Sequence, residues 1–254
     1  MCWRFALRPK WIVRHVLVVI LCSVMIMACF WQLQRLEDKR QYRDLVQARQ
    51  EAPRQDIATV VPDEAAVAGA LYRSVDATGV YVASDTFVVE NRSLNGASGA
   101  WVLTPLLLDD GAAVVVNRGF VGFDREGVIV PPPPPVGRVR VEGLVYPSQE
   151  RGRFGPKDPT GGTLSVLARV DLARVALQVD YGVVPAYVQL VSSDPPEPIP
   201  DPTVPALVAL GTPEPDLGPH LAYAVQWAIF TIIAGGGYVL LLRRVAEEQG
   251  NEPH

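Results

Sequence analysis

The residues best suited to binding a ligand lie at the start of an apolar run near the C-terminal end of the chain. On a helix that begins at His220, residues three, four and seven positions further on share its face, which brings Tyr223, Ala224 and Trp227 into line with the imidazole. His220 is the only imidazole near this end of the run, and an imidazole nitrogen is a strong ligand for a haem iron. The pattern therefore predicts a site for a flat apolar ligand.

A second apolar run, near the N-terminus, ends at the matching depth with Trp31, Gln32, Gln34 and Arg35. Gln32 on this run and Gln226 on the other fall inside the edge of a bilayer, where an amide side chain needs a hydrogen-bond partner. We therefore expect the two runs to meet at this level, with the aromatic and basic side chains around the ligand.

The same residues also have a simpler interpretation. Trp31, Tyr223 and Trp227 could form the ordinary belt of aromatic residues at a membrane surface, and His220 could be a solvated first residue of a helix. The residue types alone leave both interpretations open.

Two charge-free stretches must position these side chains. Residues 16–34 form a run of 19 and residues 221–242 a run of 22, and at about 1.5 Å per residue each can cross a hydrocarbon core about 30 Å thick. A buried core helix is the alternative for the second run, but such helices rarely extend so far without a charge. A cleaved signal peptide or a lipoprotein leader ending at Cys29 is the alternative for the first. Because that run continues past Cys29 to Leu33, we expect an uncleaved anchor.

Basic residues beside the runs predict the orientation. Four Lys or Arg and no acid precede the first run, and Arg243 and Arg244 follow the second. Short basic ends stay in the cytoplasm, whereas a long intervening domain is translocated largely regardless of its charge. The predicted order is a cytoplasmic tail (1–14), a transmembrane helix (15–35), an extracytoplasmic β-rich domain with a proline-rich return linker (36–219), a second transmembrane helix (220–242) and a cytoplasmic tail (243–254).

The intervening domain is expected to have an α+β fold dominated by an antiparallel sheet. The first helix should continue through residues 35–50 to Pro53, a DG turn at residues 109–111 predicts a hairpin, and residues 164–178 have helical spacing. The five prolines of residues 131–135 predict a rigid spacer, and residues 194–219 an irregular linker. Strands are predicted at 71–76, 79–82, 86–91, 101–108, 112–117, 139–146 and 186–191.

The composition of the domain excludes several kinds of chemistry. Between Arg35 and Pro219 there is no His, Cys or Met, which argues against copper or zinc carriage, covalent haem attachment and hydrolysis with an imidazole base. All three cysteines lie within residues 2–29, so the domain has no disulfide. Asp109 and Asp110 belong to a turn and Asp124 and Glu126 to a polar loop, so no pair of acids suggests carboxylate catalysis. The net charge of −4 with no long basic patch argues against nucleic acid as a partner. We do not expect an enzyme.

Four segments resemble the signatures of the Surfeit-locus family of cytochrome oxidase assembly factors. They are FWQLQRL at residues 30–36 with Lys39 following, GAWVLTPL at 99–106, VNRGFV at 116–121 and HLAYAVQW at 220–227. Each segment is short, but the four occur in the family's order and with its two-helix topology. Cys29 and Asp38 depart from the family pattern, and residues 151–180 match it poorly.

The resemblance implies a non-enzymatic assembly factor for a haem-copper cytochrome c oxidase of the aa3 type, in a bacterial plasma membrane. Such a protein would assist haem a insertion or the maturation of the catalytic subunit, with that subunit, other respiratory-complex subunits and the lipid bilayer as partners. The family's proposed haem-contacting histidine corresponds to His220, which would be the metal ligand, and its neighbouring aromatic residue to Trp227. The alternative within the family is a docking subunit of the oxidase or a respiratory supercomplex that binds no haem.

Two arginines complete the predicted site. Arg35 or Arg118 could pair with haem propionates at the outer surface, since guanidinium groups bind carboxylates in a bidentate manner. Arg118 also has a structural interpretation, because Asn117 and Gly119 beside it favour a turn and its five donors could hold loops together.

Overall fold

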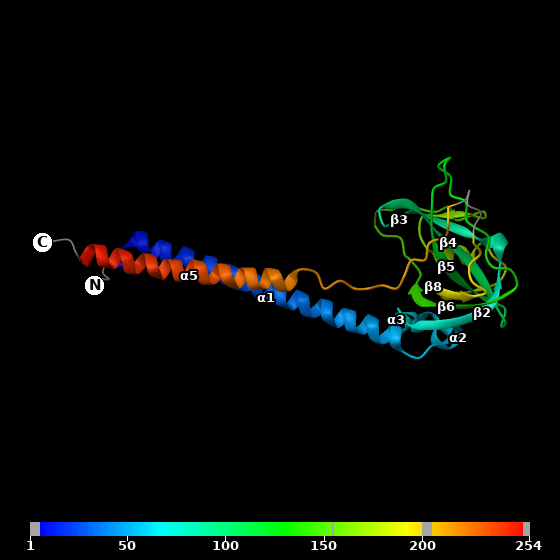
Figure 1. Cartoon of the computed structure of the whole chain (residues 1–254), viewed down its shortest axis with the longest axis horizontal. Coiled ribbons are helices and arrows are strands. Elements are labelled where there is room, and N and C mark those ends of the chain that lie inside the picture. The colour runs from blue at the N-terminus through cyan, green and yellow to red at the C-terminus, as the bar shows by residue number, and fades with distance from the viewer. Residues whose placement is uncertain (1–5, 154, 200–204, 251–254) are drawn as a thin grey trace. The chain divides into compact units, whose positions relative to one another are not determined.

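The computed structural model describes residues 6–153, 155–199 and 205–250 of the chain (Figure 1). The ends of the two predicted tails (1–5, with Cys2, and 251–254) and residues 200–204 of the predicted linker lie outside the described residues. The chain divides into two compact units. One unit consists of Met1–Leu45 and Glu214–His254, and the other of Val46–Pro213.

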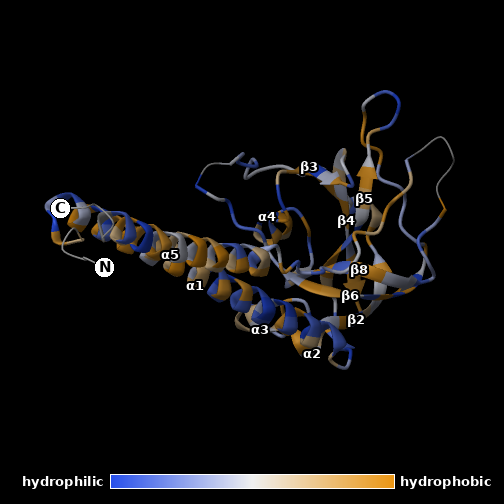
Figure 2. Cartoon of the chain, turned by 60° about the vertical axis from the view of Figure 1, so that its left-hand side comes forward, coloured by the Kyte–Doolittle hydropathy of each residue, from blue (hydrophilic) through white to orange (hydrophobic). Residues whose placement is uncertain are grey.

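The first unit is built from two long helices. α1 covers Pro9–Glu51 and ends two residues before Pro53, while α5 covers His220–Gly250. Both are long and apolar enough to cross a membrane. In the most apolar 18-residue stretch of each helix, only 6% (α1) and 0% (α5) of the residues are buried inside the protein. Figure 2 shows apolar residues along both helices and polar residues along the last turns of α1. A core helix of a soluble protein would be mostly buried, so this exposure fits a membrane protein.

The two helices of this unit meet along one stripe of side chains, here called the seam. Its members are less exposed than their neighbours and recur every three or four residues, as in a coiled coil. Ala224, at 2% exposure, allows close approach of the helices. The seam comprises Trp11, His15, Val18, Cys22, Met25, Cys29, Gln32 and Leu36 of α1 and His220, Ala224, Trp227, Thr231, Ala234, Tyr238 and Leu242 of α5.

The second unit is a mixed eight-stranded sheet with strand order β1-β2-β6-β8-β5-β4-β3-β7. Because β2 pairs with β4 as well as with β6, strands β2, β6, β8, β5 and β4 close into a small barrel. The strands are β1 (Gln55–Asp56), β2 (Ser74–Tyr81), β3 (Phe87–Leu94), β4 (Ala97–Leu108), β5 (Ala112–Gly122), β6 (Arg138–Pro147), β7 (Val166–Leu167) and β8 (Gly182–Asp194).

The expectation of an antiparallel sheet is correct for most strand pairs but wrong for three. β1–β2, β3–β7 and β5–β8 are parallel. The predicted hairpin is present, since β4 and β5 pair antiparallel across the turn at residues 109–111. The two strands of a hairpin are joined by a short turn whose residues can be recognised in the sequence. Parallel strands are joined by a long connection, so no turn residue indicates which strands pair.

Two element predictions need correction. The strands predicted at 71–76 and 79–82 are replaced by one continuous strand, β2, which covers only Ser74–Tyr81. Gly79 lies where β2 meets β4: a Cβ there would lie 2.2 Å from the Leu107 carbonyl oxygen. The glycine is therefore a point of close approach rather than a strand end. Of the predicted helix at 164–178, only α4 (Leu172–Ala176) is helical, begun by its N-cap Asp171, and residues 166–167 instead extend the sheet as β7.

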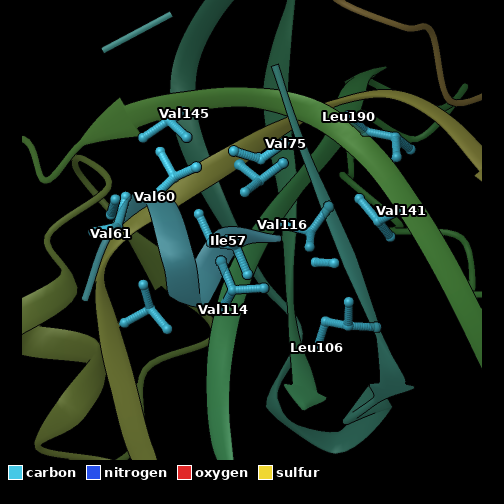
Figure 3. Close-up of a cluster of buried hydrophobic side chains, with 14 of the residues drawn as sticks. Ile57, Val60, Val61, Val75, Leu106, Val114, Val116, Val141, Val145 and Leu190 are labelled. Atoms are coloured by element: carbon cyan, nitrogen blue, oxygen red, sulfur yellow. The ribbon is translucent and has the colours of Figure 1, made fainter. Parts of the chain in front are cut away.

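The barrel interior is a valine-rich core. Short helices α2 (Ile57–Val60) and α3 (Val67–Ala70) supply Ile57, which is fully buried, and neighbours that pack with strand residues from β2, β4, β5, β6 and β8 (Figure 3). The core of the sheet unit therefore rests on apolar packing.

Single 3-10 turns lie at Glu64–Ala66 and Ala83–Asp85. The predicted linker is partly ordered by the sheet, because Val208 forms an antiparallel bridge with Phe120 of β5.

Candidate ligand site between the two long helices

Near one end of the seam, a hydrogen bond joins the two helices. Nδ1 of His220, the first residue of α5, lies 2.8 Å from Oε1 of Gln32 on α1. Gln32 thus has the partner that the sequence indicated it would need. Gln226, the other amide, is exposed on α5. This contact fixes the antiparallel level at which the two helices meet.

The second ring nitrogen of His220, Nε2, has no hydrogen-bond partner among the described residues. It lies beside Gly218, where an added Cβ would come within 3.3 Å of Nε2 and 3.4 Å of Cδ2. Gly218 has a φ of +66° and follows a turn in which its N–H donates to Asp216 Oδ1 at 2.9 Å. A side chain would crowd Nε2 at this position, so the glycine keeps the nitrogen accessible.

The aromatic residues of the predicted site differ in exposure. Trp227 lies in the seam, half-buried and edge-to-face with Phe230 at a centroid distance of 6.1 Å. Thr231, one turn further on, donates its hydroxyl to the Trp227 carbonyl at 2.9 Å. Trp31 and Tyr223 are 58% and 46% exposed and are not members of the seam. Trp227 can therefore contact a ligand from within the seam, and the exposed rings of Trp31 and Tyr223 can cover an apolar ligand or face lipid.

Arg35 lies one helical turn beyond Gln32 on α1 and is exposed. It makes no hydrogen bond or ion pair within the described part of the chain, so its guanidinium is available to an anionic group.

A second interhelical hydrogen bond lies near the other end of the seam. Nδ1 of His15 lies 2.7 Å from the hydroxyl of Tyr238, and Nε2 of the same ring lies 3.1 Å from the Ala6 carbonyl oxygen. Both nitrogens of this imidazole are therefore engaged, in contrast to His220. The bonds at Gln32 and His15 are about 26 Å apart along α1 at 1.5 Å per residue, close to the thickness of a hydrocarbon core.

Arg118 belongs to the sheet unit, where its side chain is buried. Its Nε and Nη2 donate to the two carboxylate oxygens of Glu197 at 2.9 and 2.5 Å, while Nη1 and Nη2 donate to the carbonyls of Pro132 and Pro133 at 2.8 and 2.9 Å. Its guanidinium also lies 5.8 Å from the ring centroid of Tyr81. This geometry favours the structural interpretation and gives the proline run a role, since carbonyls freed from a sheet ladder accept from Arg118.

The polar side chains of Tyr81 and Asn117 beside Arg118 are buried. Burial raises the pKa of the Tyr81 phenol, and the charge of Glu197 adds to that rise. The Tyr81 hydroxyl and Asn117 Nδ2 have no hydrogen-bond partner among the described residues. No group of three or more His, Cys, Asp or Glu side chains that could hold a metal occurs in the described ranges.

Sequence reasoning did not anticipate three parts of these sites. Nothing in the sequence indicates the role of Gly218 except its position two residues before His220. The carboxylate that accepts from Arg118 belongs to Glu197, which lies 79 residues away in the predicted linker. The His15–Tyr238 bond left a clearer trace, a histidine near the basic end of the first apolar run.

The sequence model of the SURF1 family matches residues 19–232. The uncharacterized SURF1-like proteins Rv2235 of Mycobacterium tuberculosis and Mb2259 of Mycobacterium bovis are each 29% identical to this chain over 262 residues. The alignment covers 98% of this chain and 91% of each relative. The matched range includes Gln32 of α1 and His220 of α5.

Proposed function

This chain belongs to the SURF1 family, and we propose that it is a non-enzymatic assembly factor for a haem-copper cytochrome c oxidase of the aa3 type. The family is associated with cytochrome oxidase assembly. Within that role, the protein assists haem a insertion into the catalytic subunit, or the maturation of that subunit, and holds haem a as a transient cargo. Its partners are the catalytic subunit and other respiratory-complex subunits.

The observation that carries the proposal is the state of His220. One of its nitrogens is bonded to Gln32, and the other is unpartnered within the described residues and lies beside a glycine. Histidines that bind metals have this arrangement, with one nitrogen held by an acceptor and the other directed at the metal. His220 Nε2 would therefore bind the haem iron, and haem would be held without a covalent link.

The neighbouring residues suit the remaining parts of haem a. Trp227 would contact the porphyrin from the seam, and the exposed rings of Trp31 and Tyr223 would cover its apolar faces. Arg35, exposed one turn beyond Gln32, would pair with a propionate. Arg118 is fully engaged with Glu197 and two carbonyls, so we assign it to the folding of the sheet unit.

We place the protein in a bacterial plasma membrane with α1 and α5 as its spans. The basic residues before the first span and after the second support cytoplasmic termini and an extracytoplasmic sheet unit. The distance between the two interhelical hydrogen bonds supports a hairpin that crosses the bilayer once in each direction. A translocated domain without cysteine is also stable to changes of redox compartment.

A deletion strain tests the assembly role. Membranes of the strain should contain less haem a per catalytic subunit than membranes of the parent, and the wild-type gene should restore the ratio. Complementation with the His220→Ala variant, at matched protein level, distinguishes an assembly factor that delivers haem from a docking subunit that binds none. Failure of this variant supports haem delivery, whereas full rescue would leave a docking subunit that binds no haem. An unchanged oxidase in the deletion strain would contradict both.

A further inference from the structure

The contact between Gln32 and His220 couples the orientation of the amide to the position of the imidazole proton. Gln32 Oε1 is an amide oxygen, which has lone pairs and can only accept a hydrogen bond. Were the amide turned over, its NH2 would donate to an unprotonated Nδ1. With Oε1 2.8 Å from Nδ1, as in this structure, the hydrogen lies on Nδ1. A neutral imidazole has a single N–H, so the lone pair must then be on Nε2, the nitrogen that lies beside Gly218.

Both partners are fixed by their own helices. Gln32 lies on the seam in the middle of α1, where the backbone is held by helical hydrogen bonds on both sides. His220 begins α5, and its turn is closed by the bond from the Tyr223 N–H to the Pro219 carbonyl at 3.1 Å. A half-buried amide near a membrane boundary loses free energy if its oxygen has no donor, so the bond should persist whenever the helices are paired.

We infer that Gln32 is a positioning residue that holds His220 in the Nδ1–H tautomer and so presents Nε2 to iron. The inference rests on the proposed function, since it needs haem to bind at His220. Metal-binding histidines usually donate their second N–H to a carboxylate, carbonyl or water, which fixes the tautomer and the ring orientation. Here the side-chain amide of another helix is the acceptor. The site therefore forms only when α1 and α5 are paired in this register.

The tautomer is measured directly, without haem. Full-length protein labelled with 15N-histidine is placed in phospholipid nanodiscs, and His220→Ala identifies the His220 signals among the three histidines. The wild type should show a protonated Nδ1 and an unprotonated Nε2. In Gln32→Leu the Nε2–H tautomer should appear. Gln34→Leu is the matched control, because Gln34 is exposed and has no hydrogen-bond partner within the described ranges.

Haem binding by the same variants completes the test. Gln32→Leu should weaken haem affinity about 10-fold, the loss typical for removal of a partner of a metal-binding histidine. Gln32→Glu keeps an acceptor, so it should retain affinity and lower the reduction potential of the bound haem, because a carboxylate makes the imidazole a stronger donor to iron. Retention in this variant would show that the haem site needs a hydrogen-bond acceptor at position 32 rather than glutamine itself.

The possible failures are distinct. Wild-type protein with the Nδ1–H tautomer that binds no haem would overturn the proposed function and the positioning role together. Wild-type protein that binds haem through His220 but shows Nε2–H, or keeps its tautomer and affinity in Gln32→Leu, would overturn the role of Gln32 alone.

Discussion

The hydroxyl of Tyr238 and Nδ1 of His15 lie 2.7 Å apart, and they join the helices at the end of the seam opposite to Gln32 and His220. The two rings are edge-to-face with a centroid distance of 5.6 Å. Because Nε2 of His15 lies 3.1 Å from the Ala6 carbonyl, this imidazole is occupied on both sides. The two histidines of the seam thus differ in kind: His15 joins elements of the protein, whereas His220 keeps one nitrogen accessible.

Tyr238→Phe removes the bond to His15 and keeps the ring. The helix pair should lose about 0.6 kcal/mol, the average measured for hydrogen bonds between membrane helices, and haem binding at His220 should be unchanged. The measurement is unfolding of the full-length protein in mixed micelles as a function of denaturing detergent. A loss of haem binding comparable to that of His220→Ala would contradict this separation of roles.

Arg118→Ala leaves the carboxylate of Glu197 and two proline carbonyls without their donor. The free energy of unfolding of the sheet unit should fall by about 3 kcal/mol, as for other broken buried ion pairs. Thermal or chemical unfolding of the full-length protein measures it. Arg138→Ala is the control, because its partner Asp109 is exposed and its loss should have little effect. Unchanged stability together with lost haem would instead assign Arg118 to a propionate.

Gly218→Ala places a Cβ 3.3 Å from His220 Nε2. We expect weaker haem binding, since the methyl group occupies the approach to that nitrogen, and the change is read by titration with haem. The substitution also strains the backbone, because Gly218 has a φ of +66°. Gly211→Ala controls for strain: Gly211 has a φ of +71° and no atom near its would-be Cβ. Equal effects of both variants on haem binding would show that strain, not crowding, is responsible.

Tyr187→Phe tests the electrostatics of the sheet unit. Burial raises the pKa of the Tyr187 phenol to about 12 from an unfolded value of 10. Because the pKa is higher in the folded state, the contribution of the neutral Tyr187 phenol to the free energy of unfolding is complete below pH 10. This contribution is lost as the pH rises through 12, at up to about 1.4 kcal/mol per pH unit. The variant should therefore lose less stability between pH 10 and 12 than the wild type, measured by denaturant unfolding. Parallel curves for the two proteins would contradict the raised pKa of Tyr187 in the folded state.

The sequence alone predicts the features with a short-range signal. Two charge-free runs predict the helices, and a DG turn predicts the β4–β5 hairpin. Barrel closure left no such signal. The sequence divides residues 71–82 into two strands, the second beginning at Gly79. In the structure Gly79 lies inside β2, where that strand approaches the Leu107 carbonyl, and only the three-dimensional pairing reveals this.

The candidate site divides in the same way. Helical spacing places His220 and Trp227 on the seam, but it also places Tyr223 with them, and Tyr223 is 46% exposed. The partner of His220 lies 188 residues away, so no local pattern identifies it; only the cost of an unbonded amide in a membrane indicated that Gln32 needed one. Arg118 cannot be assigned from its neighbours, because its carboxylate partner comes from a distant linker.

The most direct test of the central claim is the haem content of purified protein. Wild type and His220→Ala are expressed in cells that make haem a, purified identically and compared by their haem absorption per protein, with circular dichroism to establish equal folding. We predict a haem band in the wild type that is lost in His220→Ala. An equal band in both proteins, or none in the wild type, would contradict haem binding through His220.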